Sequence, residues 1–387
     1  MRLIFASLAS HGHIYPLIPL ALAAKDAGHD VVFATSEEFL APLRKAGLEV
    51  AAAGLPIRAA FGKLHGGIPE SRTPEQLNEM ISEVFGEIMP RQVMQDLKPL
   101  LDVIRPDLVV HEAGNPGAAV AAWKAGIPGL CHGFGRESAS PVVAVIGDRM
   151  RAFAAEQGLD LPGDYPAAAG NRYLDICPPS WQTPEFKAAV DRIELRPVAW
   201  NEPGELPSGV RYRKRPLVYL TLGTAMGNAL VLRQAIEGLA KLPVDVLVAS
   251  GPSLTDVDLG EMPGNVRLEA WVPQGDLLPH VDLVVHHGGS GTTLGALAAG
   301  KVQLCIPQGA DQFTNAEALV AAGACAVLLP GELNADAVTE LARRLLADEA
   351  MQAVAHRFRD EIAEMPSPES IVARLPKLAE LARVGGS

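Results

Sequence analysis

The chain has 387 residues, of which 48% are apolar and 20% are charged, and its formal net charge is -12. This length suits two domains with full cores, and the composition excludes general disorder. The acidic balance argues against nucleic acid or an anionic membrane surface as a partner, because both need a basic footprint on the protein. No apolar run approaches the ~20 residues of a membrane span. The start, MRLIFASLAS, lacks the regions of a signal peptide and reads as a first strand.

The four cysteines are scattered along the chain and form no CxxC pair: Cys131, Cys177, Cys305 and Cys325. Buried thiols in a reducing compartment are the simplest explanation of this pattern. We therefore expect a cytoplasmic protein without disulfides.

The first part of the chain alternates short apolar strands with helical apolar spacing. Strands are predicted at Arg2 to Ala6, Val31 to Ala34 and Leu48 to Ala52, and the helix after the first strand ends at Gly28. Such alternation implies parallel, right-handed βαβ units, whose ligands bind at the carboxyl ends of the strands. His13 lies at that end of the first strand. The alternative is a histidine that only caps or packs the start of a helix.

The stretch from 54 to 94 is rich in Phe, Met, Gly and Pro. Adaptable apolar side chains suit a broad, oily ligand. The candidates for contact with such a ligand are Phe61, Met80, Phe85 and Met89, and Phe134 follows the predicted strand Gly129 to His132. Ordinary packing of an amphipathic helix is the alternative for each of them.

A fourth strand is predicted at Asp107 to His111, and Glu112 follows it directly. A carboxylate at the end of a strand can fix the tautomer of a neighbouring imidazole and stabilise its protonated form. The alternative is a solvated loop charge. His111 points to the opposite side of the strand, so we do not assign it a catalytic role.

A linker is predicted near residues 195–216, where proline and glycine are dense and the run Arg211 to Arg215 is solvated. The strand Leu217 to Thr221 restarts the alternation, and Thr224 just beyond it is a candidate phosphate contact. The predicted domains are 1–205, 206–365 and a C-terminal helical segment, 366–387.

The most informative stretch runs from Trp271 to Gln312. A buried strand at Val281 to Val285 leads into His287-Gly288-Gly289-Ser290-Gly291-Thr292 and then into helical spacing that stops at Gly300. A glycine turn at a helix N-terminus presents backbone N–H groups and the positive end of the helix dipole to an anion. The predicted ligand is a diphosphate. Glycine allows its close approach, and the hydroxyls of Ser290 and Thr292 and the ring N–H of His287 add donors.

Residues on both flanks of this turn extend the predicted site. The Trp271 indole can stack on a nucleobase, and the Gln274 amide can pair with a base edge. Asp311 and Gln312 follow the next predicted strand, Gln303 to Ile306, and suit the hydroxyls of a sugar. Base, diphosphate and sugar contacts thus follow one another along one strand–helix–strand unit.

This segment resembles the nucleotide-sugar signature of the GT-B glycosyltransferases of family 1. His-His-Gly-Gly-Ser-Gly-Thr and the later Asp-Gln carry most of the similarity, which extends over nearly the whole chain. Within the family the chain is most similar to bacterial natural-product sugar transferases of the enediyne and macrolide type, above all the calicheamicin glycosyltransferases.

The resemblance implies an α/β protein of GT-B fold: two Rossmann-like parallel-sheet domains that face a central cleft, with a C-terminal helix crossing back to the first domain. It implies that His13, in a Gly-His-x-x-Pro pattern, is the general base, that Glu112 orients it, and that the 54–94 and 134–150 stretches wall the acceptor site. The expected reaction is inverting transfer of a deoxysugar from a dTDP-sugar to a hydroxyl of a polyketide-like aglycone. No cofactor or metal is expected, and the protein should be a monomer or homodimer.

Two motifs that resemble metal sites are not assigned a function, and two positions depart from the family pattern. Asp256-Val257-Asp258 resembles a metal-binding DxD but has no preceding strand, and His11-x-His13 lacks further ligands at metal spacing. Lys301-Val302 and Gln308 stand where many relatives have proline and an aromatic residue, so the identity of the sugar is open. Two alternatives remain: a nucleotide-sugar 2-epimerase of the same fold, and a non-catalytic partner of another transferase.

Overall fold

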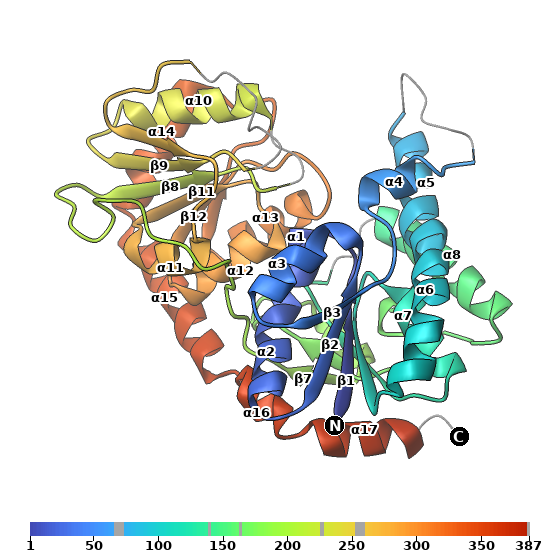
Figure 1. Ribbon diagram of the computed structural model, residues 1–387. Coiled ribbons are helices and arrows are strands. Elements are labelled where there is room, and N and C mark those ends of the chain that lie inside the picture. Colours follow the sequence, from blue (N-terminus) through green and yellow to red (C-terminus); the bar gives the residue numbers. More distant parts are fainter. Residues whose placement is uncertain (66–72, 138–140, 162–164, 225–227, 252–259, 385–387) are drawn as a thin grey trace. The chain divides into compact units, whose positions relative to one another are not determined.

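The computed structural model describes residues 1–65, 73–137, 141–161, 165–224, 228–251 and 260–384. The chain forms two compact units. Unit 1 is Met1–Arg196 together with Pro366–Ser387, and unit 2 is Pro197–Met365. Each unit is built on its own parallel β-sheet with helices around it, as the fold-class prediction requires (Figure 1).

Unit 1 contains a seven-stranded sheet in the order β3-β2-β1-β4-β5-β6-β7, with parallel pairing throughout. The strands are β1 (Arg2–Ala6), β2 (Asp30–Thr35), β3 (Glu49–Ala52), β4 (Leu108–Glu112), β5 (Gly129–His132), β6 (Tyr173–Asp175) and β7 (Arg192–Glu194). Strands β4 and β5 are buried along their whole length, because helices cover both faces of a parallel sheet.

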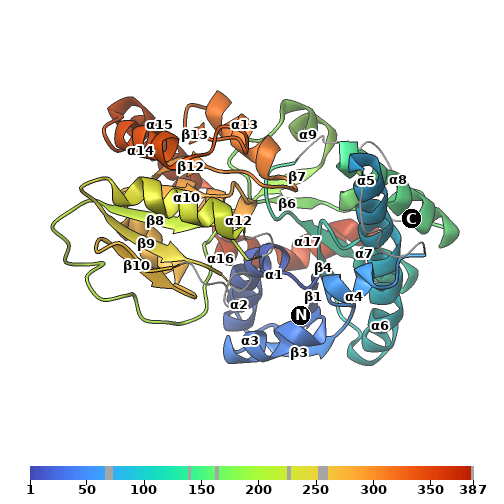
Figure 2. The same ribbon diagram turned by 90° about the horizontal axis from the view of Figure 1, so that it is seen from above.

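The helices of unit 1 follow the order expected for βαβ units. They are α1 (His11–Ile14), α2 (Ile18–Asp26), α3 (Leu40–Lys45), α4 (Ile57–Phe61), α5 (Pro74–Glu83), the π-helix η3 (Val84–Ile88), α6 (Met89–Ile104), α7 (Pro116–Lys124), α8 (Pro141–Glu156) and α9 (Pro184–Ala189), with short 3-10 turns η1 (Tyr15–Leu17), η2 (Glu37–Phe39) and η4 (Pro166–Ala168). Helix α5 packs against α8, and α6 packs against α7 (Figure 2).

One core of unit 1 lies between the sheet and helices α5 to α7. Ile4, Val109, Val84, Leu97 and Met89 are among its buried members. The amphipathic spacing of α6 turns its apolar stripe toward the sheet. The helix is capped by Arg105, which has a left-handed φ of 48° and stands directly before Pro106.

The C-terminal segment belongs to unit 1, as the fold prediction requires. It forms α16 (Pro368–Val372), which packs against α2 (Figure 1), and α17 (Leu375–Val384), which packs against β5. The expected single helix is therefore two short helices with a turn at Ala373-Arg374. Ser367 caps the first of them by accepting from the Ser370 N–H at 3.3 Å.

Unit 2 contains a six-stranded parallel sheet in the order β10-β9-β8-β11-β12-β13. The strands are β8 (Leu217–Thr221), β9 (Asp245–Ala249), β10 (Val266–Glu269), β11 (Leu283–His286), β12 (Val302–Cys305) and β13 (Cys325–Val327). The helices are α10 (Ala229–Ala240), α11 (Gln274–Leu277), η6 (Leu278–His280), α12 (Ser290–Ala298), α13 (Gln312–Ala321), α14 (Ala335–Leu346) and α15 (Glu349–Glu364). Two buried apolar clusters line the opposite faces of the sheet.

The division between the units lies at Arg196 and Pro197, earlier than the predicted boundary after residue 205. Hydrogen bonds on either side of this position explain the difference. The Arg196 N–H donates to the carbonyl of Pro366 in unit 1 at 2.8 Å, whereas Asn201 accepts from the Asp276 N–H in unit 2 at 3.2 Å. The proline- and glycine-rich segment after Pro197 is thus bound to unit 2.

Candidate active site

The predicted base and its carboxylate partner are in contact. His13 lies in α1, just after β1, and Glu112 is the last residue of β4, which pairs with β1. His13 Nδ1 is 3.2 Å from Glu112 Oε1. The sequence placed Glu112 just beyond its strand, and the structure makes it the final strand residue.

Glu112 is completely buried, whereas 19% of the His13 side chain is exposed. Backbone N–H groups compensate the buried carboxylate: Leu8 donates to Oε1 at 3.2 Å, and Gly114 donates to Oε2. A neutral His13 that donates its Nδ1 proton to Glu112 keeps Nε2 as its basic nitrogen. This arrangement can remove a proton from a hydroxyl and stabilise the resulting imidazolium.

Two further residues pack closely against the dyad. A Cβ at Gly114 would lie 3.1 Å from His13 Cε1 and 3.0 Å from Glu112 Oε2, so a larger residue there would make the dyad shift by a few tenths of an ångström. The Phe134 ring lies 4.6 Å from the His13 ring, tilted by 42°. Phe134 was predicted as an acceptor contact, and it is placed beside the base. Gly114 was missed, because only a close approach in three dimensions singles it out.

The other predicted acceptor contacts divide into two groups. Met80 and Met89 are 8% and 0% exposed and belong to the core under α5 and α6, so their prediction as a surface for a ligand is wrong for this structure. The apolar stripe of the helices turns them toward the sheet. Phe61 and Phe85 are half-buried and meet edge to face with ring centroids 6.5 Å apart. They remain candidates.

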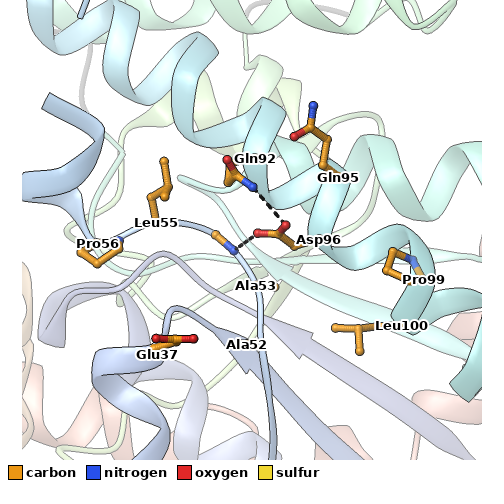
Figure 3. Close-up of a pocket in the computed structure, with 11 residues that line it drawn as sticks. Glu37, Ala52, Ala53, Leu55, Pro56, Gln92, Gln95, Asp96, Pro99 and Leu100 are labelled. Atoms are coloured by element: carbon orange, nitrogen blue, oxygen red, sulfur yellow. Dashed lines mark hydrogen bonds between the residues drawn. The ribbon is translucent and has the colours of Figure 1, made fainter. Parts of the chain in front are cut away.

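A cavity of about 600 Å³ lies elsewhere in unit 1, between the loop after β3 and α6 (Figure 3). Asp96 lies at its wall, where it accepts from the Gly54 N–H at 2.9 Å and from Gln92 Nε2 at 3.0 Å. Its polar lining is completed by Glu37 and Gln95. None of the individually predicted site residues lines this cavity, but Gly54, Leu55, Pro56 and Gln92 belong to the 54–94 stretch that was predicted to wall the acceptor site.

The glycine turn of unit 2 forms as predicted between β11 and α12. Gly288 has φ +87°, and a Cβ there would lie 2.9 Å from the carbonyl oxygen of Gln312. Its N–H, however, donates to His286 Nδ1 at 3.1 Å, so this amide is not available to a phosphate as the sequence had suggested. Gly291, the second residue of α12, is exposed, and no atom lies within 4 Å of an added Cβ. The open end of the helix is therefore at Gly291.

His287 is neutral at pH 7 in this structure. Burial is the largest cause that lowers its pKa, to about 4, and the Asp311 carboxylate opposes the shift. Its ring packs between Gly223 and Gly289, and within the described ranges its buried Nδ1 has no hydrogen-bond partner. The neutral ring can offer a hydrogen bond to a ligand, as the sequence predicted, but it carries no positive charge.

The hydroxyls of the turn bond within the protein. Ser290 Oγ donates to Asp311 Oδ2 at 2.8 Å, and Thr292 Oγ1 donates to Gln274 Oε1 at 3.3 Å. Gln274 Oε1 also accepts from the Tyr219 hydroxyl at 3.2 Å. Both hydroxyls and Gln274 Oε1 thus already have partners within the protein, and their predicted contacts with phosphate and base stay predictions. The sequence could not show these pairings, because they join separate strand–helix connections.

The remaining predicted donor residues surround this turn. Trp271 follows β10 and is 40% exposed, so a large face is accessible. Asp311 is half-buried and accepts from Ser290 and from Asn315 Nδ2 at 2.9 Å. Gln312 is 5% exposed, and its Oε1 accepts from the Gln308 N–H at 2.8 Å, so this oxygen stabilises the loop before α13, while the predicted sugar contact stays a prediction. Thr224 is half-buried after β8.

Two negative findings concern only the described part of the chain. It holds no group of three or more His, Cys, Asp or Glu side chains placed to bind a metal, and no helix long and apolar enough to cross a membrane. Asp256 and Asp258 lie outside the described residues. The four cysteines are free and buried, in agreement with the sequence.

Comparison with known proteins matches both units to one family. Residues 22–223 match the family described as erythromycin biosynthesis protein CIII-like, N-terminal domain, and residues 233–378 match its C-terminal domain. The L-demethylnoviosyl transferase of Streptomyces niveus is 33% identical over 383 residues, which cover 97% of each chain.

Solved structures extend this similarity. The glycosyltransferase SsfS6 of Streptomyces sp. SF2575, complexed with thymidine diphosphate, superposes with a TM-score of 0.81 at 28% identity, covering 97% of this chain and 99% of its own. The calicheamicin glycosyltransferase CalG4 has a TM-score of 0.81 at 22% identity, with 98% of each chain covered, and this likeness shows a shared fold.

Proposed function

Because this chain belongs to the erythromycin biosynthesis protein CIII-like family of glycosyltransferases, we propose that it moves a deoxysugar from a dTDP-sugar to a hydroxyl of a polyketide-like aglycone. The observation that carries the proposal is the contact of 3.2 Å between His13 Nδ1 and the buried Glu112. An epimerase needs no such base for an incoming hydroxyl. An intact base also favours a catalyst over a partner that only activates another transferase.

In the proposed reaction His13 Nε2 removes the proton of the acceptor hydroxyl, and Glu112 stabilises the imidazolium that forms. The oxygen attacks the anomeric carbon from the face opposite the diphosphate. The carbon–oxygen bond to the diphosphate breaks, dTDP leaves, and the configuration of the carbon inverts. Phe134, beside the base, is the acceptor contact that the geometry supports best.

The N-terminus of α12 stabilises the departing diphosphate in this proposal. Its backbone amides and dipole present positive potential at the open position of Gly291. Charge neutralisation by a helix end can replace a divalent ion at a leaving group, so we propose that the transfer needs no metal. Activity that survives EDTA would agree, whereas complete loss on chelation, restored by Mg²⁺ or Mn²⁺, would overturn this part.

The base of the donor is proposed to stack on Trp271. The complex of the SsfS6 relative with thymidine diphosphate supports thymine as that base. Trp271→Ala should weaken thymidine, dTMP and dTDP by a similar ~1–3 kcal/mol, the scale of base–aromatic stacking. Calorimetry with the three ligands checks this, and a loss confined to dTDP would assign Trp271 to another role.

The decisive experiment separates the three functions. The protein is incubated with dTDP-sugars alone and then with a panel of hydrophobic aglycones, and the products are identified by mass spectrometry and by NMR of the anomeric centre. Glycosylated aglycone of inverted configuration supports the proposal. Epimerised nucleotide sugar without an aglycone, or retained configuration, would reject it.

A further inference from the structure

The backbone of Gly288 is bonded on both sides by buried side chains that the reaction above does not use. Its N–H donates to His286 Nδ1 at 3.1 Å, and its carbonyl accepts from Asn315 Nδ2 at 3.1 Å. Gly288 also has the left-handed φ of +87°. Glycine enters and leaves such a conformation without strain, so it is these two hydrogen bonds that fix the peptide groups on either side of Gly288.

The hydrogen bonds of His286 determine which of its nitrogens carries the proton. A backbone N–H can only donate, so Nδ1 is the acceptor and the proton of the neutral ring is on Nε2. Nε2 then donates to Gln303 Oε1 at 2.8 Å, and the Cys305 sulfur lies 3.5 Å away. A protonated ring could not accept from Gly288. Burial, with the neighbouring His287, lowers the pKa of His286 to about 3, so the accepting form is present throughout the neutral range.

Asn315 connects the turn to the next helix. It is 1% exposed and lies in α13. Besides the Gly288 carbonyl, its Nδ2 is 3.1 Å from Ser290 Oγ and 2.9 Å from Asp311 Oδ2. Ser290 is the first residue of α12, and Asp311 is the residue before α13. One amide group therefore ties the Gly288 carbonyl to the starts of two helices.

We propose that His286 and Asn315 are positioning residues that fix the Gly288 backbone, so that the amides at the start of α12 point toward the diphosphate of the donor. Neither residue touches the substrate. The inference rests on the proposed function, since it presumes that a diphosphate binds at this turn. It predicts a defect that is specific to phosphate-bearing ligands, because the nucleoside makes no contact with the turn.

The test exploits the two nitrogens of the imidazole. In His286→Asn the short amide places its oxygen near the position of Nδ1 and can still accept from Gly288, whereas the longer side chain of His286→Gln reaches the position of Nε2 and leaves the Gly288 N–H without an acceptor. Calorimetry measures the Kd for dTDP and for thymidine. His286→Gln should raise the Kd for dTDP ~10-fold or more and leave that for thymidine within about twofold, and His286→Asn should stay within about threefold for both.

Asn315→Ala provides an independent test, because it removes the donor to the Gly288 carbonyl and leaves His286 intact. It should weaken dTDP ~10-fold, again without loss of thymidine. Glu317→Ala is the matched control, since Glu317 is an exposed residue of the same helix, and it should behave as the unchanged protein.

The outcomes distinguish this inference from the proposed function. If the unchanged protein binds dTDP no more tightly than thymidine, the diphosphate site itself is misassigned. If it prefers dTDP, and either His286→Gln or Asn315→Ala keeps that preference, the positioning role is overturned. Equal loss of both ligands in a folded variant would also overturn it. Should His286→Gln fail to fold by circular dichroism, Asn315→Ala decides the question by the same ratio of dissociation constants.

Discussion

The base site of unit 1 and the glycine turn of unit 2 use histidine in opposite ways. His13 is partly exposed and touches a carboxylate that two backbone N–H groups hold in place, and this carboxylate can stabilise the imidazolium that forms when the ring takes up a proton. His286 and His287 are buried, and burial lowers their pKa values to about 3 and about 4. The comparison teaches that one site is built to accept a proton, whereas the other is kept neutral and depends on backbone groups.

The largest expected effect belongs to the base. His13→Ala should lower kcat by ~100-fold or more, the usual scale for a lost general base. Binding of dTDP should stay nearly unchanged, because His13 belongs to the proton-transfer site. Glu112→Gln should act in the same direction and less strongly. Steady-state kinetics and calorimetry check both variants, and turnover within a few-fold of the unchanged enzyme would make His13 a structural residue.

Two glycines of the turn should respond differently to the same added methyl group. Gly288→Ala should cost ~1–3 kcal/mol of unfolding free energy, because its φ is +87° and the Cβ would lie 2.9 Å from the Gln312 oxygen. Gly291→Ala should fold normally, because the Cβ meets no atom within 4 Å. It should still weaken dTDP several-fold, since the methyl group enters the space proposed for the diphosphate. Denaturant melts and calorimetry separate the two effects, and unimpaired dTDP binding by Gly291→Ala would remove the diphosphate from this position.

Acid should destabilise unit 2 more than unit 1. Burial lowers the pKa values of His286 and His287 below the ordinary value of 6.5. The stability that these neutral rings contribute is therefore complete above pH 6.5 and is lost as the pH falls toward 4. In unit 1, His111 and His132 behave in the same way, since burial lowers both pKa values to about 4. There, however, burial raises the pKa of Glu137 to about 7 and that of Asp175 to about 6. These carboxyls stabilise the folded state as the pH falls, and they offset the histidines.

Between pH 6 and pH 5 the free energy of unfolding of unit 2 should fall by roughly 1–3 kcal/mol per pH unit, because about two protons are bound on unfolding. Hydrogen exchange measured peptide by peptide reports the two units separately. Equal acid sensitivity of the two units would show that the difference in their buried groups does not govern stability.

The smallest effect is expected at Gly114. A Cβ there would stand 3.0–3.2 Å from atoms of Glu112 and His13, a distance at which the neighbours must shift by a few tenths of an ångström. Gly114→Ala should therefore lower kcat several-fold by displacing the base, with KM for the dTDP-sugar and thermal stability nearly unchanged. A fall in stability without a change in kcat would show that the methyl group disturbs packing alone.

The spacing of apolar residues was sufficient to predict the α/β architecture, because buried parallel strands and the helices between them carry apolar patterns that differ from those of loops. Strands β1, β5 and β8 have the predicted bounds, and β11 is displaced by two residues at its start and one at its end. The pairing of His13 with Glu112 was implied by the family resemblance. The structure brings the two together because β1 and β4 are neighbouring strands whose carboxyl ends meet at one edge of the sheet.

The sequence by itself determined the fold class, the family and the position of the glycine turn, because these depend on local pattern and residue order. Only the tertiary structure decided how individual side chains are used. Met80 and Met89 became core residues, Ser290 was drawn to Asp311, and Gln312 was turned onto its own loop. The tertiary structure also revealed His286, Asn315 and Gly114, whose proposed roles depend on the contacts that these residues make in the folded chain. Which partner satisfies a buried polar group depends on distances in three dimensions, and spacing along the chain does not contain them.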